Sequence, residues 1–152
     1  MLRIPTTEVG ADAVPSVSRL RRWPIRLLRA TAVLFLLDSL LQAALAGLFV
    51  TGDVGLLAWH AANAQMLSAL VVVQTIAAVV IWRSLRGPWW PPALTVGLLG
   101  LLSIQQGLGE SRMLGGHIPL GMAIFGTGAA LTYWAFSFQP AGRPRAEREA
   151  DK

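Results

Sequence analysis

The chain of 152 residues contains no cysteine, one tyrosine and two histidines, and only 14% of its residues are charged. The absence of cysteine excludes disulfide bonds, thiolate metal sites and the covalent attachment of a c-type haem. Because 54% of the residues are hydrophobic, too few polar side chains remain to coat a soluble globule. The composition therefore predicts an integral membrane protein.

Four apolar stretches are long enough to cross a hydrocarbon core about 30 Å thick at about 1.5 Å rise per residue. They cover residues 30–50, 56–82, 92–109 and 116–138. The connections between them are short and rich in Gly, Pro and polar residues, so consecutive helices should be antiparallel neighbours. We expect an all-α, integral membrane four-helix bundle at residues 30–138, between a flexible basic tail at 1–29 and a charged tail at 139–152.

The first apolar stretch also has features of a secretory signal peptide. A basic segment precedes it, and the small residues of Ala44-Leu45-Ala46 could form a cleavage site. However, Asp38 and Gln42 interrupt the apolar run, which continues through Val50. This length and polarity favour a retained membrane span.

The basic residues are distributed asymmetrically around the predicted spans. Twelve of the thirteen precede the first span, lie between the second and third, or follow the fourth, whereas Arg112 alone falls on the other side. Because Lys and Arg accumulate in cytoplasmic loops, both termini are predicted to be cytoplasmic. Twelve of the thirteen are arginine, a bias typical of a high-GC bacterium, so we expect a bacterial inner membrane protein.

Membrane anchoring also accounts for the net charge of +5. The arginine-rich segment before the first span is expected to contact anionic lipid head groups. No nucleic-acid partner is needed to explain these charges. The predicted partners are therefore the lipid bilayer and, in addition, either another membrane protein or a second copy of the chain.

A short internal repeat places the two histidines at equivalent positions. Gln42-Ala-Ala-Leu-Ala-Gly near the end of the first span is echoed by Gln105-Gln-Gly-Leu-Gly near the end of the third. Each segment is followed, across a short outer loop, by a histidine, first His60 and then His117. The halves therefore resemble two copies of one helical hairpin, related by an axis along the membrane normal.

Paired histidines on diagonal helices are what axial ligation of a haem requires. An iron takes two imidazoles at about 2 Å each, and the interior of a four-helix bundle leaves room for two histidines and a macrocycle. No acidic residue lies at a metal-ligand spacing from either histidine, which favours haem over a bare metal ion. We predict that His60 and His117 bind the iron of one haem b, for electron transfer or haem handling.

Other residues near the histidines are candidates for contacts with the haem. Gly121, four residues after His117, begins a stripe with Gly128 that could receive a flat tetrapyrrole, although close helix packing is the more common role of such glycines. Asn63 could hydrogen-bond a propionate. Arg112 could pair with a propionate or, equally, with Glu110.

Polar residues inside the spans are costly and tend to have a role. Five of them suggest a polar interior: Asp38, Gln42, Gln74, Gln105 and Gln106. An alternative function is that of a proton-coupled small-molecule transporter, in which Asp38 carries the proton. The layout of four helices with one acid in the first span resembles that of the small multidrug exporters. With no second acid nearby, a structural hydrogen bond is the favoured role of Asp38. A non-catalytic accessory subunit, packing on a partner through the glycine-rich fourth span, is the third possibility.

Two segments carry a resemblance to known families: QAALAGLFVTGDVGLLAWHAANAQ and QQGLGESRMLGGHIPLGMAIFG. Their layout is similar to that of an uncharacterised family of small four-helix bacterial membrane proteins with a domain of unknown function. More distantly, a histidine at the outer start of the second helix of each hairpin resembles one half of the haem A synthase fold. That resemblance implies haem binding by His60 and His117. Haem A synthase has a second bundle and acidic catalytic residues in an outer loop, whereas this chain has one bundle and no glutamate followed closely by a histidine, so no catalytic residue is predicted.

Overall fold

The structure, a computed structural model, describes residues 22–139. This part of the chain forms four helices and no strand: α2 (Trp23–Val50), α3 (Leu56–Ser84), α4 (Trp90–Glu110) and α5 (Leu114–Ser137). Each helix is long and apolar enough to cross a membrane. The predicted all-helical fold with four apolar spans is therefore confirmed, and it indicates a membrane protein.

The largest difference from the predicted boundaries concerns the start of the first helix. It begins at Trp23 and not at residue 30, so the predicted tail at 1–29 is too long. Pro24 lies in the first turn, where its missing N–H has no helical partner to lose, and Arg26 and Arg29 continue the helix. The other helix ends differ from the predicted ones by at most two residues. The remainder of both predicted tails lies outside the described residues.

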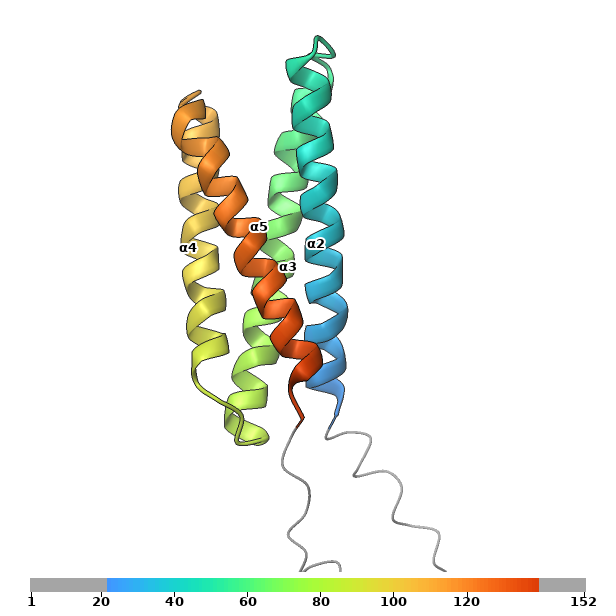
Figure 1. Cartoon of the computed structure of the whole chain (residues 1–152), viewed down its shortest axis with the longest axis vertical. Coiled ribbons are helices and arrows are strands. Elements are labelled where there is room, and N and C mark those ends of the chain that lie inside the picture. The colour runs from blue at the N-terminus through green and yellow to red at the C-terminus, as the bar shows by residue number, and fades with distance from the viewer. Residues whose placement is uncertain (1–21, 140–152) are drawn as a thin grey trace, which may run out of the picture.

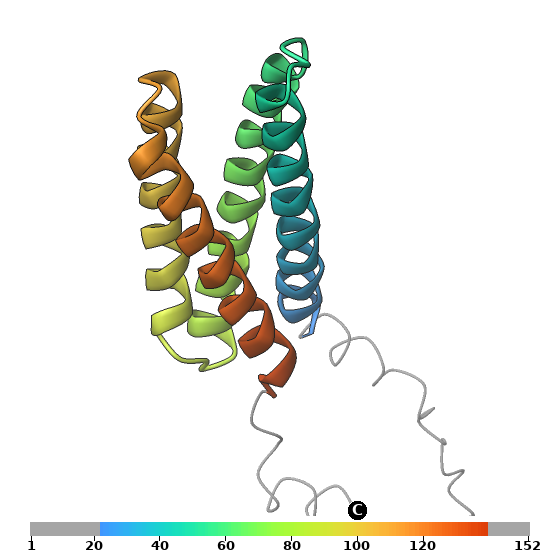
Figure 2. The ribbon, with the colours of Figure 1, turned by 45° about the horizontal axis from the view of Figure 1, so that its top comes forward.

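The helices form a bundle in which each is packed against the two next to it in the order α2, α3, α4, α5, so that α3 and α5 lie on a diagonal. Figure 1 shows α2 beside α3 and α4 beside α5, with α5 slanting from α4 at the top to α2 at the bottom. In Figure 2 the two hairpins again separate toward the top. The top is where the α2–α3 and α4–α5 connections lie; we call it the histidine end, and the opposite end the arginine end.

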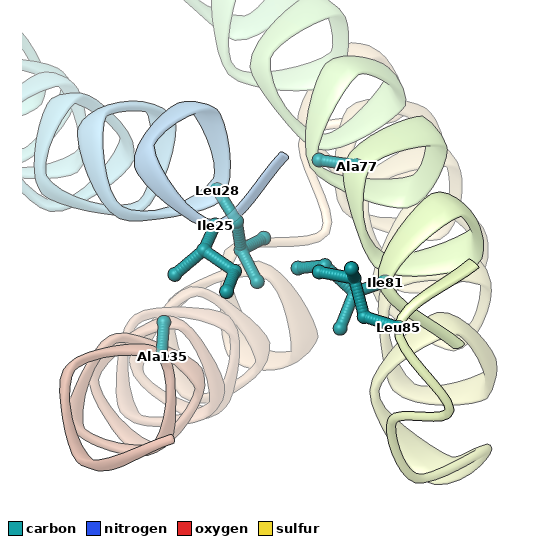
Figure 3. Close-up of a cluster of buried hydrophobic side chains, with 6 residues drawn as sticks. All are labelled: Ile25, Leu28, Ala77, Ile81, Leu85 and Ala135. Atoms are coloured by element: carbon teal, nitrogen blue, oxygen red, sulfur yellow. The ribbon is translucent and has the colours of Figure 1, made fainter. Parts of the chain in front are cut away.

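The arginine end is closed by a cluster of buried apolar side chains from three helices. Figure 3 shows them pointing toward one another: Ile25, Leu28, Ala77, Ile81, Leu85 and Ala135. Arg29 adds a polar clamp, because its Nε donates to the carbonyl of Ala135 at 2.8 Å and its Nη2 to that of Phe138 at 3.1 Å. These carbonyls end α5 and lack helical partners, so the guanidinium joins the end of α5 to α2.

A second cluster fills the middle of the bundle with residues from all four helices: Phe35, Leu67, Val71, Leu98, Leu102 and Ile124. Phe35 is fully buried, and its ring lies where a Cβ on Gly128 would be. Gly128 therefore lets α5 approach α2 closely, as small residues do between membrane helices. No residue of α2 beyond Phe35 is buried, so the packed core ends at this level and the histidine end is open.

Candidate functional site: a cavity with two histidines

A cavity of about 490 Å³ lies above the middle cluster, toward the histidine end, and all four helices contribute to it. Its volume is within the range of about 300–1,000 Å³ that is usual for small-molecule sites. Leu67, Leu102 and Ile124, which belong to the middle cluster, line it together with His60 and His117. One side is formed by side chains that are exposed on the surface of α2 and α5: Leu40, Ile118, Met122 and Phe125. That side faces the lipid if the helices span a membrane.

The two imidazoles approach each other inside this cavity. The ring centroids of His60 and His117 are 6.3 Å apart, and the ring planes are inclined at 53°. His60 comes from the start of α3 and His117 from the start of α5, the diagonal pair of the bundle. The structure thus brings together the two residues that the sequence singled out.

Each histidine is held by the backbone of the preceding helix in the same hairpin. Nδ1 of His60 donates to the carbonyl of Gln42 at 3.2 Å, and Nδ1 of His117 donates to the carbonyl of Gln105 at 2.9 Å. Gln42 and Gln105 are the two residues that begin the repeated segments of the sequence. With Nδ1 used as a donor, Nε2 of each ring carries the lone pair that a metal can accept.

The surroundings of His60 include a second contact, made by the side chain of Gln42. Nε2 of Gln42 lies 3.2 Å from Nε2 of His60, while Oε1 of Gln42 accepts from Nδ2 of Asn63 at 2.9 Å. Because Asn63 fixes which end of the amide is the oxygen, the amide N–H of Gln42 donates to His60. Both ring nitrogens of His60 are therefore hydrogen-bonded.

Gln105 occupies the equivalent position in the second hairpin, but its side chain points elsewhere. Its Nε2 would lie 3.0 Å from a Cβ on Gly121, so the amide rests against the backbone of α5. Its Oε1 is buried without a hydrogen-bond partner among the described residues. Nε2 of His117 also makes no hydrogen bond within residues 22–139, so the two hairpins are not equivalent in detail.

The glycine stripe below His117 is mostly occupied by protein. Gly121 lines the cavity, but the Gln105 amide covers its backbone, and the ring of Phe35 covers that of Gly128. Close helix packing, the more common role of such glycines, therefore accounts for Gly128, and only Gly121 is left beside the cavity. Sequence reasoning overlooked Gly109, where a Cβ would lie 3.0 Å from Cε1 of His117, which shows that the imidazole rests against this glycine.

The other predicted polar residues separate into those near the cavity and those away from it. Gln106 lines the wall but its amide is used in the α3–α4 contact, where it bonds Gln65 at 2.7 Å and Ser68 at 2.9 Å. Asn63 is one hydrogen bond away from His60 through Gln42. Gln74 is buried near the arginine end and donates to the carbonyl of Thr31, so it takes no part in the site.

Asp38 and Arg112 are not in the cavity wall. The backbone carbonyl of Asp38 accepts from Asn63 at 3.1 Å, and its Oδ2 is buried without a partner among the described residues. Arg112 lies in the α4–α5 connection with a positive φ of 55°. Within the described part of the chain it forms no ion pair, so the predicted pairing with Glu110 is not present.

Several residues of the cavity were missed by sequence reasoning because they are ordinary apolar or small side chains: Ser39, Leu40, Ala43, Ala46, Leu67, Leu102, Ile118, Met122, Ile124 and Phe125. A signal for part of this set does exist. Ala43 and Ala46 lie three residues apart on α2, one and four residues after Gln42, and so flank the contact with His60. Small residues there leave the space beside the imidazoles unfilled.

No family model, curated protein or solved structure matches this chain. The function must therefore be argued from the cavity itself.

Proposed function

We propose that this protein binds one b-type haem between His60 and His117 and carries electrons in a bacterial inner membrane. The observation that carries the proposal is the separation of the two imidazoles. Two rings that bind one iron from opposite sides at about 2 Å each have centres roughly 6 Å apart. The centroid distance of 6.3 Å agrees with this spacing, and the rings would turn their Nε2 atoms toward the iron on binding.

The donor set also fits a bis-histidine haem. Axial histidines commonly donate Nδ1–H to a backbone carbonyl, which fixes the tautomer and orients Nε2 toward the metal. Both rings have this hydrogen bond, to Gln42 and to Gln105. The described residues hold no group of three or more His, Asp, Glu or Cys that could bind a bare metal ion, and the two imidazoles suit an iron whose other ligands come from a macrocycle.

The remaining walls suit a large apolar group with a few polar contacts. The middle cluster forms a dry floor, and the small residues Ala43, Ala46 and Ala64 leave width beside the rings. The amide of Gln105 offers a donor and an acceptor to a ligand carboxyl group. Such a wall holds the group non-covalently, as the absence of cysteine requires.

Bis-histidine haem supplies one-electron chemistry and no open coordination position for a substrate. The contribution of the chain is to hold the two imidazoles in one tautomer, to exclude water at the level of Leu67 and Leu102, and to keep the site at one depth in the membrane.

The proposed orientation places both termini in the cytoplasm. Five of the six arginines in the described residues lie at the arginine end: Arg22, Arg26, Arg29, Arg83 and Arg86. Since positive charge is retained on the cytoplasmic side, the histidine end faces outward. The site is then near the outer leaflet, formed by two hairpins that we interpret as a parallel repeat.

The experiment is a visible spectrum of the full chain purified in detergent after expression in a haem-replete host. We expect one haem per chain, a Soret band and the sharp reduced bands of low-spin bis-histidine haem, reversible on oxidation. The variant with both His60→Ala and His117→Ala should lose these bands while it remains helical and monodisperse. A wild-type chain without a Soret band, or a double variant with an unchanged one, would refute the proposal.

A further inference from the structure

The surroundings of the two histidines differ at the nitrogen that a metal would bind. Nε2 of His60 accepts a hydrogen bond from Gln42, whereas Nε2 of His117 has no hydrogen-bond partner among the described residues. Each ring is also held through Nδ1 and a backbone carbonyl, and they differ in packing, because Phe49 lies edge-on to His60 and Gly109 lies against His117. The Gln42 amide is therefore the hydrogen-bonding difference between the two candidate ligands.

The side chain of Gln42 is held in this position from two sides. Its Nε2 contacts His60 and its Oε1 accepts from Asn63, whose Nδ2 also donates to the carbonyl of Asp38 at 3.1 Å. The equivalent residue Gln105 has no such anchor and lies against Gly121. The contact between Gln42 and His60 is therefore not a consequence of the repeat.

We propose that Gln42 is a positioning residue that caps His60 in the ligand-free protein and so sets the order of ligation, His117 first and His60 second. The inference rests on the proposed haem site. His117 offers its lone pair at once, whereas His60 becomes available only when the Gln42 amide turns away.

The cap is weak enough to open. An amide–imidazole hydrogen bond between neutral groups contributes modestly, so its loss changes the fraction of available His60 by about two- to tenfold. The bond between iron and an imidazole that is already in position is stronger than the hydrogen bond from Gln42. The hydrogen bond from Gln42 also keeps His60 in the Nδ1–H tautomer, so that the ring is oriented before the second ligation step.

The order of ligation is tested by titrating hemin into the full chain, produced without haem and placed in lipid nanodiscs. His60→Ala should bind hemin through His117 and give a five-coordinate, high-spin spectrum. His117→Ala should bind about two- to tenfold more weakly, because the remaining ring is capped. Adding Gln42→Leu to His117→Ala should restore affinity by about two- to tenfold, the range expected for loss of one hydrogen bond.

The matched control is Gln65→Leu in the same His117→Ala background. It also removes a glutamine amide, but one that is exposed, lies outside the cavity wall and touches neither histidine, so it should leave the affinity unchanged. Asn63→Leu is a second route to the same effect, because it frees the Gln42 side chain without altering it. All variants are compared by circular dichroism and size-exclusion chromatography.

In the wild-type chain, stopped-flow mixing with hemin should show a high-spin intermediate before the low-spin spectrum, and Gln42→Leu should shorten its lifetime. Equal affinities of His60→Ala and His117→Ala, or equal effects of Gln42→Leu and Gln65→Leu, would overturn the assignment to Gln42 while leaving the haem site in place. A wild-type chain that binds no hemin overturns the proposed function and this inference with it.

Discussion

His60 and His117 lie on helices that are diagonal in the bundle, and their ring centroids are 6.3 Å apart. The two buried apolar clusters of the described residues lie below this level, at the middle of the bundle and at the arginine end. At the histidine end, the two imidazoles are the side chains that approach each other across the diagonal. A ligand held by both rings would join the hairpins where packing does not.

Gly109→Ala should weaken haem binding without unfolding the protein. The added methyl group would lie 3.0 Å from Cε1 of His117 and displace the imidazole by a few tenths of an ångström. We expect a several-fold loss of hemin affinity and a shifted low-spin spectrum. Gly107→Ala on the same helix is the control, because nothing lies within 4 Å of its added Cβ. Equal spectra for the two variants would argue against His117 as an axial ligand.

Gly128→Ala should destabilise the bundle itself. Its Cβ would overlap the ring of Phe35, and overpacking of a buried contact costs about 1–3 kcal/mol. The midpoint of thermal unfolding in detergent should fall relative to that of wild type. Gly126→Ala, in the same helix with open space around the added group, should leave the midpoint unchanged or raise it. A Gly128→Ala variant as stable as wild type would contradict the observed packing of Phe35.

Arg29→Gln should loosen the end of α5. The variant loses the bonds from the guanidinium to the carbonyls of Ala135 and Phe138, and hydrogen bonds of charged groups contribute about 1.5–3 kcal/mol each when buried and less when partly exposed. Faster amide exchange in the last turn of α5 is the expected readout. Arg26→Gln changes an exposed arginine of the same helix and should leave exchange there unaltered.

The absence of cysteine makes the orientation directly measurable. Asp53→Cys places a thiol at the histidine end and Ser84→Cys places one at the arginine end, both at exposed positions. In intact spheroplasts a membrane-impermeant maleimide should modify Asp53→Cys alone, because the proposed orientation keeps the arginine end in the cytoplasm. Modification of Ser84→Cys alone would reverse the proposed orientation.

Asp38→Asn should leave the haem spectrum unchanged. The side chain of Asp38 is not part of the cavity wall, and the hydrogen bond from Asn63 goes to its backbone carbonyl, which the substitution retains. A transporter that uses Asp38 as its proton carrier would lose transport with the same substitution. The two functions therefore give opposite results for one variant, measured by absorbance and by a resistance assay.

The fold was largely predictable, because the length and hydropathy of an apolar segment identify a membrane span. The error at Trp23 shows the limit of that rule. Arg26 and Arg29 mark the N-terminal limit of the first apolar run, yet the helix begins before them, at Trp23. Arg29 is accommodated in the helix because its guanidinium reaches the carbonyls that end α5. Such a contact joins residues more than a hundred positions apart, and no local pattern in the sequence predicts it.

The site was predictable to the extent that it depends on rare residues. Two histidines in repeated surroundings predicted their approach, and Gln42 and Gln105 marked the helices that hold them. The different directions of the two glutamine side chains were not predictable, because they depend on Asn63 in one hairpin and on Gly121 in the other. The packing of Phe35 on Gly128 likewise requires the three-dimensional contact.

The level of Phe35 divides the bundle into two parts with separate tasks. Below it, Arg29 and the apolar clusters hold the helices together without any contribution from the histidines. Under the proposed function, the chain would insert and assemble in the bilayer as an empty receptor and receive its haem afterwards, through the side of the cavity formed by α2 and α5. Maturation would then be an event within the membrane, governed by the supply of haem and not by the synthesis of the polypeptide.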